Sequence, residues 1–462
     1  MPRTAQKFHQ EAKKIAFNIP HRETIKFNIS RYDTAVSKGM ERYNDVNEAK
    51  NRAATIKRDV LKNWDNYLLE FEKNITLNGA KVLWAENTDE ATQFVKSILI
   101  ENEAKLLVKS KSMTTEEIEL NHLAESIGCE SVETDLGEFI VQVAGERPYH
   151  IVTPAMHKSK KDIAQLFNKK FDTPIESTPE ELTEYVRNVL RKKYTSAQIG
   201  VTGANFLIAD IGGISVTENE GNGLMTTAFP KIHIVIAGIE KIIPKFSQLG
   251  LFYPLLAAHG TGQQITAYNS VFTAPKKNDE TDGAEKMYVI LLDNGRTNIF
   301  ADHEAYESLS CIRCGACLNG CPVYKTIGGY TYDTTYSGPI GSVITPFLRG
   351  FRDFGHLSFA STLCGKCNEV CPVRIPLTDI LLYNRRAAVE KGLRPYAEKA
   401  VMKGFRSIGS NRKGLDIFPA WLKNGGAAPF NYFGWGPNRK MPIFAKKSFS
   451  EQYRKQNTDN IK

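Results

Sequence analysis

Apolar side chains in the first 75 residues recur every three or four positions, with charged residues between them. Two such series are Val36, Met40, Tyr43 and Ile56, Val60, Trp64, Phe71. This spacing places the apolar side chains on one face of a helix. Residues 1–75 are therefore predicted to be mostly helical, as a helix pair that packs its apolar face on the following domain. A partner-binding arm is the alternative interpretation.

Short apolar runs of strand length alternate with helical patterns from about Lys81 to Phe300. The runs are VLWA (82–85), LLV (106–108), FIVQV (139–143), FLIAD (206–210), IHIVIAGI (232–239) and YVILLD (288–293). Capping boxes, which mark helix starts, are predicted at Thr114 and at Thr178, the second with Pro179 at the first helical position. This alternation predicts an α/β domain with a mainly parallel sheet over residues 76–300.

The last third of the chain has a different pattern. Cysteine, proline and glycine interrupt short apolar stretches over residues 301–380, which predicts a cluster-binding domain held together partly by metal. Residues 381–462 begin with a predicted helix, LLYNRRAAVEKGL, and continue as a basic, aromatic-rich region. We expect this region to be an extended tail that packs on the other domains. Its apolar anchors would be Trp421, Phe430, Tyr432, Phe433 and Trp435.

Length and composition fit a multidomain globular protein. The chain has 462 residues, with 42% hydrophobic and 24% charged residues, which indicates two to four compact units. No apolar run reaches the 18 residues that a membrane-spanning helix needs. The polar start, MPRTAQKFHQEAKK, lacks the apolar stretch of a secretory signal, so a cytoplasmic location is expected.

The positive charge is concentrated at the C-terminal end. Residues 378–462 contain 17 Lys and Arg against 6 Asp and Glu, whereas the whole chain carries a net charge of +9. This region therefore accounts for the entire basic excess. It could bind an acidic partner, nucleic acid or an anionic membrane, and a solvated surface without a partner is equally consistent.

Seven of the eight cysteines lie between Cys311 and Cys371, and Cys129 stands alone as a predicted inert thiol. One dense cluster in a large chain without a signal sequence indicates metal rather than disulfides. The first motif is Cys311-x2-Cys314-x2-Cys317-x3-Cys321-Pro322. Three cysteines at this spacing can hold one cubane iron–sulfur cluster while the fourth points toward a second cluster.

The second motif, Cys364-x2-Cys367-x3-Cys371-Pro372, lacks a first cysteine, and the vacant position falls at Ser361. Because the last cysteine of each motif serves the other cluster, two ligand sets are predicted. The first set is Cys311, Cys314, Cys317 and Cys371. The second set has only three thiolates, those of Cys321, Cys364 and Cys367. The fourth iron of the second cluster could be held by Ser361, by water or by a partner, or it could be absent and leave a three-iron cluster.

Other chemistry is less well supported by the sequence. Zinc prefers two C-x2-C pairs at one tetrahedral site, which fits seven cysteines poorly. No nucleotide-binding G-x-G-x-x-G or P-loop motif is present. A polar group after a predicted strand, formed by Glu218, Asn219, Glu220 and Asn222, is interpreted as a solvent-facing turn, with a ligand site as the alternative. No catalytic residue is assigned.

Several stretches resemble a known bacterial family. They are VETDLGEFIVQVAGERPYHIVTPAMHK (132–158), GVTGANFLIADIGGISVTENEGN (200–222), CIRCGACLNGCPVY (311–324), STLCGKCNEVCPVRIPL (361–377) and the C-terminal GWGPNRKMPIFAKKSF (434–449). Together they are similar to the iron–sulfur component of a three-part L-lactate utilisation system. The likeness extends over nearly the whole chain.

The resemblance implies an α/β lactate-utilisation domain, similar in fold to sugar-phosphate isomerases and coenzyme A transferases. It also implies an α-helical ferredoxin-like domain with two [4Fe-4S] clusters and long helices between the motifs. The family's ligands carry over onto the two sets named above, and the missing first cysteine of the second motif looks like a family trait. The implied role is electron transport during oxidation of L-lactate to pyruvate, which allows growth on lactate. The implied partners are a subunit with cysteine-rich domains and a small α/β subunit.

Two rival functions remain open at this point. The chain could itself oxidise another 2-hydroxy acid, in which case it would turn over substrate without partners. It could instead be a redox- or iron-sensing binding module, for which the basic C-terminal region is the sole support. Binding of nucleic acid is not expected, and it would show a steep dependence on salt.

Overall fold

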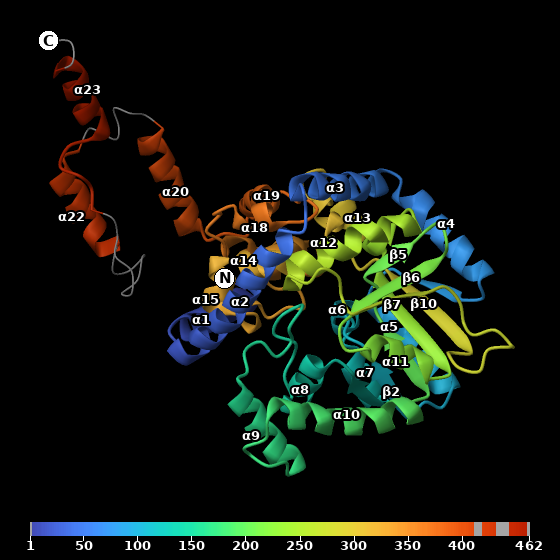
Figure 1. Cartoon of the computed structure of the whole chain (residues 1–462). Coiled ribbons are helices and arrows are strands. Elements are labelled where there is room, and N and C mark those ends of the chain that lie inside the picture. The colour runs from blue at the N-terminus through green and yellow to red at the C-terminus, as the bar shows by residue number, and fades with distance from the viewer. Residues whose placement is uncertain (1, 411–417, 431–442, 460–462) are drawn as a thin grey trace. The chain divides into compact units, whose positions relative to one another are not determined.

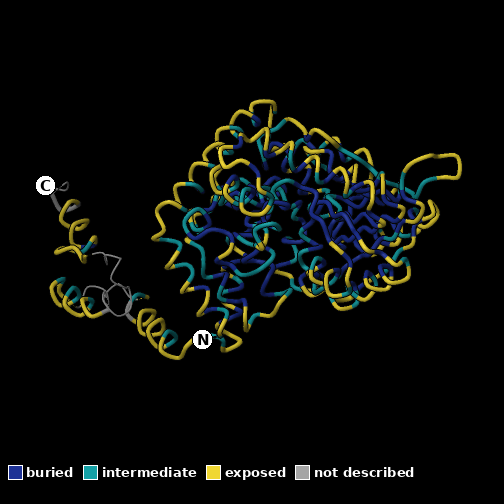
Figure 2. Tube along the Cα trace, turned by 90° about the horizontal axis from the view of Figure 1, so that it is seen from below, coloured by how far each residue is buried: buried dark blue, intermediate teal, exposed yellow. Residues whose placement is uncertain are grey.

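The computed structural model describes residues 2–410, 418–430 and 443–459 (Figure 1). Contacts between residues divide the chain into two compact units, Met1–Lys391 and Gly392–Lys462. The first unit contains the predicted helical, α/β and cysteine-rich segments, and buried residues fill its interior (Figure 2). The boundaries between those three segments remain a prediction.

The N-terminal segment is helical, as predicted, but it forms four helices rather than a pair. They are α1 (Arg3–Ala16), α2 (Ile19–Met40), α3 (Val46–Lys62) and α4 (Trp64–Leu77). Side-chain oxygens of Asn18 and Asp45 accept hydrogen bonds from the first-turn amides of α2 and α3, which fixes where these helices begin. The apolar faces pack into a core shared with the α/β and cysteine-rich segments, through residues such as Val60 and Phe71.

A six-stranded, fully parallel sheet forms the centre of the α/β segment. Its strands are β1 (Lys81–Ala85), β2 (Leu106–Lys109), β3 (Glu130–Glu133), β4 (Ile199–Thr202), β7 (Ile232–Gly238) and β10 (Lys286–Leu292). The order is β1-β10-β7-β4-β2-β3. Every residue of β2, β4 and β7 is buried, because helices cover both faces of the sheet. The prediction of a mainly parallel sheet is confirmed.

Helices connect and cover these strands. They are α5 (Thr88–Glu101), α6 (Met113–Glu117), α7 (Leu120–Ser126), α8 (Leu136–Ala144), α9 (Lys160–Phe171), α10 (Pro179–Ser196) and α11 (Asn222–Ala228). The capping box at Thr178 is confirmed. The one predicted at Thr114 is wrong, because the Ser112 side chain caps this helix and accepts a hydrogen bond from the amide of Thr115.

The strand predicted at FIVQV (139–143) is also wrong, since these residues belong to α8. Asp135 caps the helix by accepting a hydrogen bond from the amide of Glu138. Once Leu136 is counted, the apolar residues fall at helical spacing and pack together in one core; they are Leu136, Phe139, Ile140 and Val143. A run of five residues was too short to distinguish the spacing of a helix from that of a strand.

A second, four-stranded sheet was not predicted. It consists of β5 (Phe206–Ile208), β6 (Gly213–Glu218), β8 (Ile242–Ile243) and β9 (Tyr268–Phe272), in the order β8-β5-β6-β9. The predicted strand at 206–210 exists as β5, but it pairs with β6 and β8 rather than joining the parallel sheet. The helices α12 (Leu249–Thr261) and α13 (Arg296–Phe300) complete this part of the unit.

The cysteine-rich segment consists of short helices. They are η3 (Tyr306–Ser310), α14 (Ala316–Gly320), α15 (Pro322–Ile327), η4 (Tyr330–Tyr332), α16 (Gly338–Arg349), α17 (Phe351–Phe354), η5 (Gly355–Phe359), α18 (Lys366–Val370) and α19 (Leu377–Glu390). Long helices between the motifs were expected, but α16, the longest there, has 12 residues and ends at Gly350, which has a positive φ. The helix predicted at 381–393 is confirmed over residues 381–390, within α19, which begins at Leu377 and ends at Glu390.

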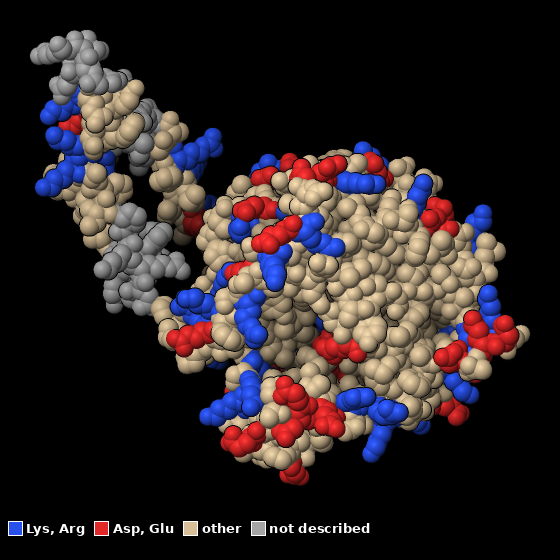
Figure 3. Space-filling view, in the orientation of Figure 1, with Lys and Arg blue, Asp and Glu red and all other residues tan. Residues whose placement is uncertain are grey.

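The C-terminal unit contains α20 (Tyr396–Gly409), α22 (Ala420–Phe430) and α23 (Phe449–Asp459), so the expectation of an extended tail is wrong for these residues. Of the predicted anchors, Trp421 and Phe430 lie on α22, whereas Tyr432, Phe433 and Trp435 lie outside the described residues. In its described part Lys and Arg outnumber Asp and Glu (Figure 3). None of the helices in the described residues combines the length and hydrophobicity needed to span a bilayer.

Candidate metal centre

The two cysteine motifs adopt the same backbone conformation. Arg313 and Leu363 both have a positive φ, of 60° and 54°, although neither is glycine. Gly315 and Gly365 follow two residues later with φ of 79° and 80°, and each begins a five-residue helix, α14 or α18. The two motifs are therefore a structural repeat as well as a sequence repeat.

This repeat places Ser361 in the position that Cys311 occupies in the first motif. The amide of Arg313 donates a hydrogen bond to Cys311 Sγ at 3.4 Å. The amide of Leu363 donates in the same way to Ser361 Oγ at 3.1 Å. The serine hydroxyl thus stands where the missing fourth thiol of the second set would be.

The fold brings together four thiols from the two motifs, those of Cys311, Cys314, Cys317 and Cys371. Burial raises the pKa of Cys317, and the three other thiols of this set raise it further. The same four cysteines line one small cavity, whose remaining wall is mostly apolar and includes Ile151, Ile340 and Ile375.

The other three thiols form a second group. Burial raises the pKa of Cys367 to about 11, with further contributions from Cys321 and Cys364. Cys321 and Cys367 are buried, whereas Cys364 is exposed. Within the described residues, no three His, Cys, Asp or Glu side chains are arranged to share one metal ion, as a single zinc site would require.

The surroundings of the thiols suit an anionic iron–sulfur cage. The amide of Tyr324 donates to Cys321 Sγ at 3.5 Å, and the amide of Ile375 donates to Cys371 Sγ at 3.4 Å. Amide hydrogen bonds of this kind stabilise negative charge on cluster sulfurs. With these donors, the apolar cavity and four thiols, the first set fits a [4Fe-4S] cluster. The second set supplies three thiols and the Ser361 hydroxyl.

Cations from distant parts of the sequence gather beside the first set. Arg313 is nine-tenths buried, its guanidinium lies over the Tyr336 ring at 4.4 Å, and Nη2 donates to Glu240 Oε1 at 3.2 Å. Burial lowers the pKa of Lys57 to about 7 and that of Lys241 to about 8, and both lysines lie close enough to Cys311 to interact with it electrostatically. We call Arg313, Lys57 and Lys241 the basic wall.

Sequence reasoning missed the basic wall. Lys57 comes from α3, where its Nζ donates to the carbonyls of Glu240 at 2.8 Å and Ile242 at 3.1 Å. Lys241 lies in η1 (Ile239–Lys241), next to the second sheet. Arg313 alone lies within a cysteine motif, and its position gave no sign that the other two lysines would join it.

The polar group at Glu218–Asn222 is only partly a solvent-facing turn. Asn219 and Glu220 are exposed, as that interpretation requires. Asn222 is buried, and Glu218 is half-buried and accepts hydrogen bonds from the amides of Gly223 at 2.6 Å and Leu224 at 2.8 Å. The group lines a pocket that reaches Cys314, which supports the ligand-site alternative.

Comparisons with known proteins agree with this architecture. The LUD domain family matches residues 68–292, and the 4Fe-4S dicluster domain family matches residues 307–375. The lactate utilization protein B of Geobacillus kaustophilus is 41% identical over 88% of this chain and 88% of its own length. The chain belongs to the lactate utilization protein B family. Its fold is accordingly a LUD domain joined to a 4Fe-4S dicluster domain, as expected.

Other members of the family align over similar lengths. The protein of that name from Bacillus subtilis is 45% identical over 76% of this chain and 73% of its own, and that from Geobacillus sp. (strain WCH70) is 38% identical over 97% and 96%. A solved structure of a DUF162 family protein from Deinococcus radiodurans covers 50% of this chain and 98% of its own, at 12% identity and a TM-score of 0.29. The fold assignment therefore rests on the strands described above and on the family matches.

Proposed function

We propose that this chain is the electron-transfer subunit of a system that oxidises L-lactate to pyruvate. The observation that carries the proposal is the sorting of the seven thiols into two groups, each containing cysteines from both motifs. Membership of the lactate utilization protein B family supports lactate as the substrate of that system. When bound, each cluster would accept and release one electron at a time.

The proposed ligands follow the two groups. The first cluster would be held by Cys311, Cys314, Cys317 and Cys371, and the second by Cys321, Cys364, Cys367 and the hydroxyl of Ser361. Serine is a harder ligand than thiolate and matches iron in a sulfide cage less well. We therefore expect the second cluster to lose its fourth iron more readily than the first.

The short helices fix the spacing between the two sites. Cys317 and Cys321 stand one helical turn apart across α14, and Cys367 and Cys371 do so across α18. The buried Tyr332 ring packs in the same core as Cys317 and Cys321, and both thiols contribute to raising its pKa. Cys317, Cys321, Cys367 and Cys371 belong to one packed core, which supports electron transfer between the two proposed clusters.

The proposal leaves oxidation of the substrate to partners. Lactate oxidation releases two electrons, and no residue of this chain is assigned to the catalytic step. The proposed partners are a subunit with cysteine-rich domains and a small α/β subunit, in the cytoplasm. The basic C-terminal unit is available for such an interaction, since its charge would favour an acidic surface.

Anaerobic purification of the full chain, alone and with co-purifying proteins, tests this function. We expect about eight irons per chain when the second cluster is complete and about seven when it is a three-iron cluster. Cluster reduction by L-lactate should require the partners. An iron-free protein would contradict the proposal. Turnover of a 2-hydroxy acid by the isolated chain with an artificial acceptor would instead favour the direct-enzyme alternative.

A further inference from the structure

A cavity of about 370 Å³, lined by both polar and apolar side chains, lies between the α/β segment and the first cysteine motif. Its lining includes Cys314 and Arg313, which also line the small cavity of the first thiol group. This volume is in the range of small-molecule sites. A ligand in this cavity would therefore lie directly beside the first proposed cluster.

The cavity also lies where an open parallel sheet binds ligands. Within the parallel sheet, the strand that follows β2 in the chain is β3, which lies on one side of β2. The strand of this sheet that follows β4 is β7, which lies on the opposite side. The loops that follow β2 and β4 contribute Lys111, Ser112, Gly203 and Asn205 to the lining. The gap between two such strands, at their carboxyl ends, is the topological switch point where ligands of these folds bind.

Three cations line the cavity, and they differ in how they are neutralised. Lys111 Nζ pairs with Asp135 Oδ2 at 3.2 Å and donates to the carbonyl of Val152 at 3.1 Å. Arg313 pairs with Glu240 and lies over the Tyr336 ring, while its buried Nε and Nη1 have no acceptor. Lys241 is 8% exposed and forms no ion pair with a described residue. Because a buried cation without an ion-pair partner is costly, Lys241 favours an anion in the cavity, and the free Nε and Nη1 of Arg313 can donate hydrogen bonds to it.

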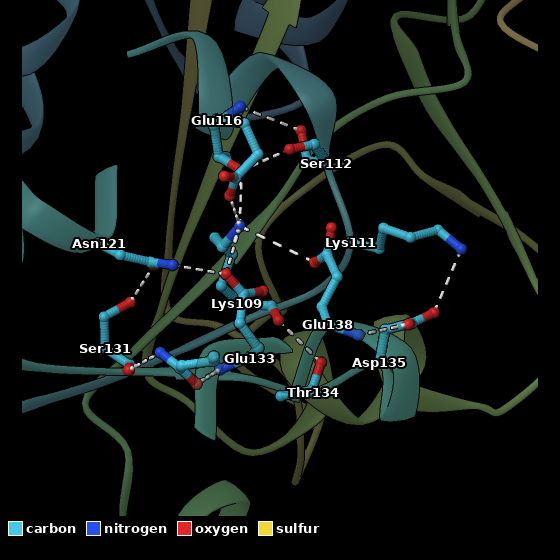
Figure 4. A network of polar contacts seen from close by, with 12 residues as sticks. Lys109, Lys111, Ser112, Glu116, Asn121, Ser131, Glu133, Thr134, Asp135 and Glu138 are labelled. Atoms are coloured by element: carbon cyan, nitrogen blue, oxygen red, sulfur yellow. Dashed lines mark hydrogen bonds and ion pairs between the residues drawn. The ribbon is translucent and has the colours of Figure 1, made fainter. Parts of the chain in front are cut away.

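The neighbouring Lys109 shows what a fully compensated lysine looks like. Figure 4 shows its Nζ surrounded by carboxylates, with Glu133 at 2.7 Å, Glu116 at 2.9 Å and Glu138 at 3.9 Å. Lys111, two residues further on, points away from this network toward Asp135. The positive charge of Lys109 is therefore compensated by carboxylates, whereas Lys241 forms no ion pair with a described residue.

The remaining lining limits the charge of the ligand. The carboxylates of Asp135, Glu218 and Glu220 belong to the same cavity, so a dianion would meet repulsion there. Polar groups such as the buried Thr217 hydroxyl, which has no hydrogen-bond partner, can bind an uncharged oxygen. The lining as a whole suits a monoanion with a polar, uncharged end.

We propose that this cavity binds a small monocarboxylate that carries a hydroxyl or carbonyl group, with its carboxylate at Lys241 and Arg313. The inference rests on the proposed function for its choice of probes, L-lactate and pyruvate. Lys241 lines this cavity but not the small cavity of the first thiol group, so its charge is available to a ligand. Bound anion next to Cys314 would make reduction of the first cluster harder, and reduction would weaken binding by the same factor.

Calorimetric titration of the anaerobically purified, iron-loaded full chain tests the proposal. L-lactate or pyruvate should bind saturably, and Lys241→Gln should weaken binding at least about tenfold, as expected for loss of a hydrogen bond to a charged group. Lys241→Arg should keep most of the affinity. Lys193→Gln is the matched control, since Lys193 pairs with Glu130 and does not line the cavity. The iron content of each variant shows whether it has folded with its clusters.

Four outcomes would overturn the proposal. They are no saturable binding by the iron-loaded chain, unchanged binding by Lys241→Gln, preferential binding of inorganic phosphate, and unaltered reduction of the first cluster at saturating ligand. If the chain still relays electrons from its partners in these cases, the inference fails and the proposed function stands. If the chain contains no iron, the proposed function fails by a separate measurement.

Discussion

The two cysteine motifs share one backbone conformation but lie in different surroundings. Four cysteines of the first thiol group enclose an apolar cavity, and the basic wall stands beside them. The second group has three cysteines, one of them exposed, and a serine at the fourth position. At the position matching the buried Arg313, the second motif has Leu363.

This difference indicates how one repeated loop could give two unequal cluster sites. The backbone decides where the ligands point, whereas the packed segments decide charge and access to solvent. Helix α3 and the short helix η1 lie beside the first site, because Lys57 and Lys241 come from them. We therefore expect the first site to be robust and the second to be labile.

The largest expected effect comes from removing a proposed ligand of the first cluster. Cys314→Ala should cost roughly half of the iron and lower the melting temperature, because cluster binding and folding of residues 301–380 are coupled. Iron analysis and thermal unfolding under anaerobic conditions measure both. Cys129→Ala is the control, since Cys129 is buried in the α/β segment and belongs to neither group. Equal iron in the two variants would contradict the ligand assignment.

Substitution of Ser361 tests which group serves as the fourth ligand of the second proposed cluster. Ser361→Cys should complete a four-thiolate set, so we expect slower iron loss to a chelator and a weaker three-iron signal in electron paramagnetic resonance. Ser361→Ala should shift both properties the opposite way. If neither variant differs from the unmodified chain, then the hydroxyl does not face the fourth iron and water or a partner supplies that ligand.

Arg313→Gln removes one buried charge from the basic wall without changing a thiol. For a charge about 8 Å away at an effective dielectric constant of about 20, the interaction is about 2 kcal/mol. This corresponds to roughly 90 mV for a one-electron couple, so the potential of the first cluster should fall by that order. Arg313→Lys keeps the positive charge, so the potential of the first cluster should stay close to that of the unmodified chain. A potentiometric titration that shows an equal fall in both clusters would mean that the wall does not act on the first site selectively.

The converse substitution gives the smallest effect. Leu363→Arg places a cation at the matching position of the second motif, where it should raise the potential of the second cluster. The shift should be smaller than that of Arg313→Gln, because the neighbouring Cys364 is exposed and solvent screens the charge. It should also diminish in high salt, whereas the effect at Arg313 should persist. Equal shifts at the two positions would contradict the difference in burial that separates the two sites.

Much of the site could be predicted from the sequence because its geometry is local. Spacings of two and three residues decide which thiols can share a cage, and the Pro-terminated ending places the last cysteine toward the other cage. The parallel strands were also predictable, since β2 and β7 are apolar runs buried on both faces. The five-residue run at 139–143 failed because its helical period is visible only together with Leu136.

The sequence by itself predicted the two thiol sets, the vacant cysteine position at Ser361 and the parallel α/β segment. The tertiary structure alone decided the pairing of β5 with β6 and β8, the joining of Lys57 and Lys241 to Arg313, and the cavity beside Cys314. The physical reason is the separation along the chain of the residues that decide each feature. Ligand spacing and strand periodicity are properties of a few neighbouring residues, whereas a buried charge acquires its partners only when segments far apart in the chain pack together.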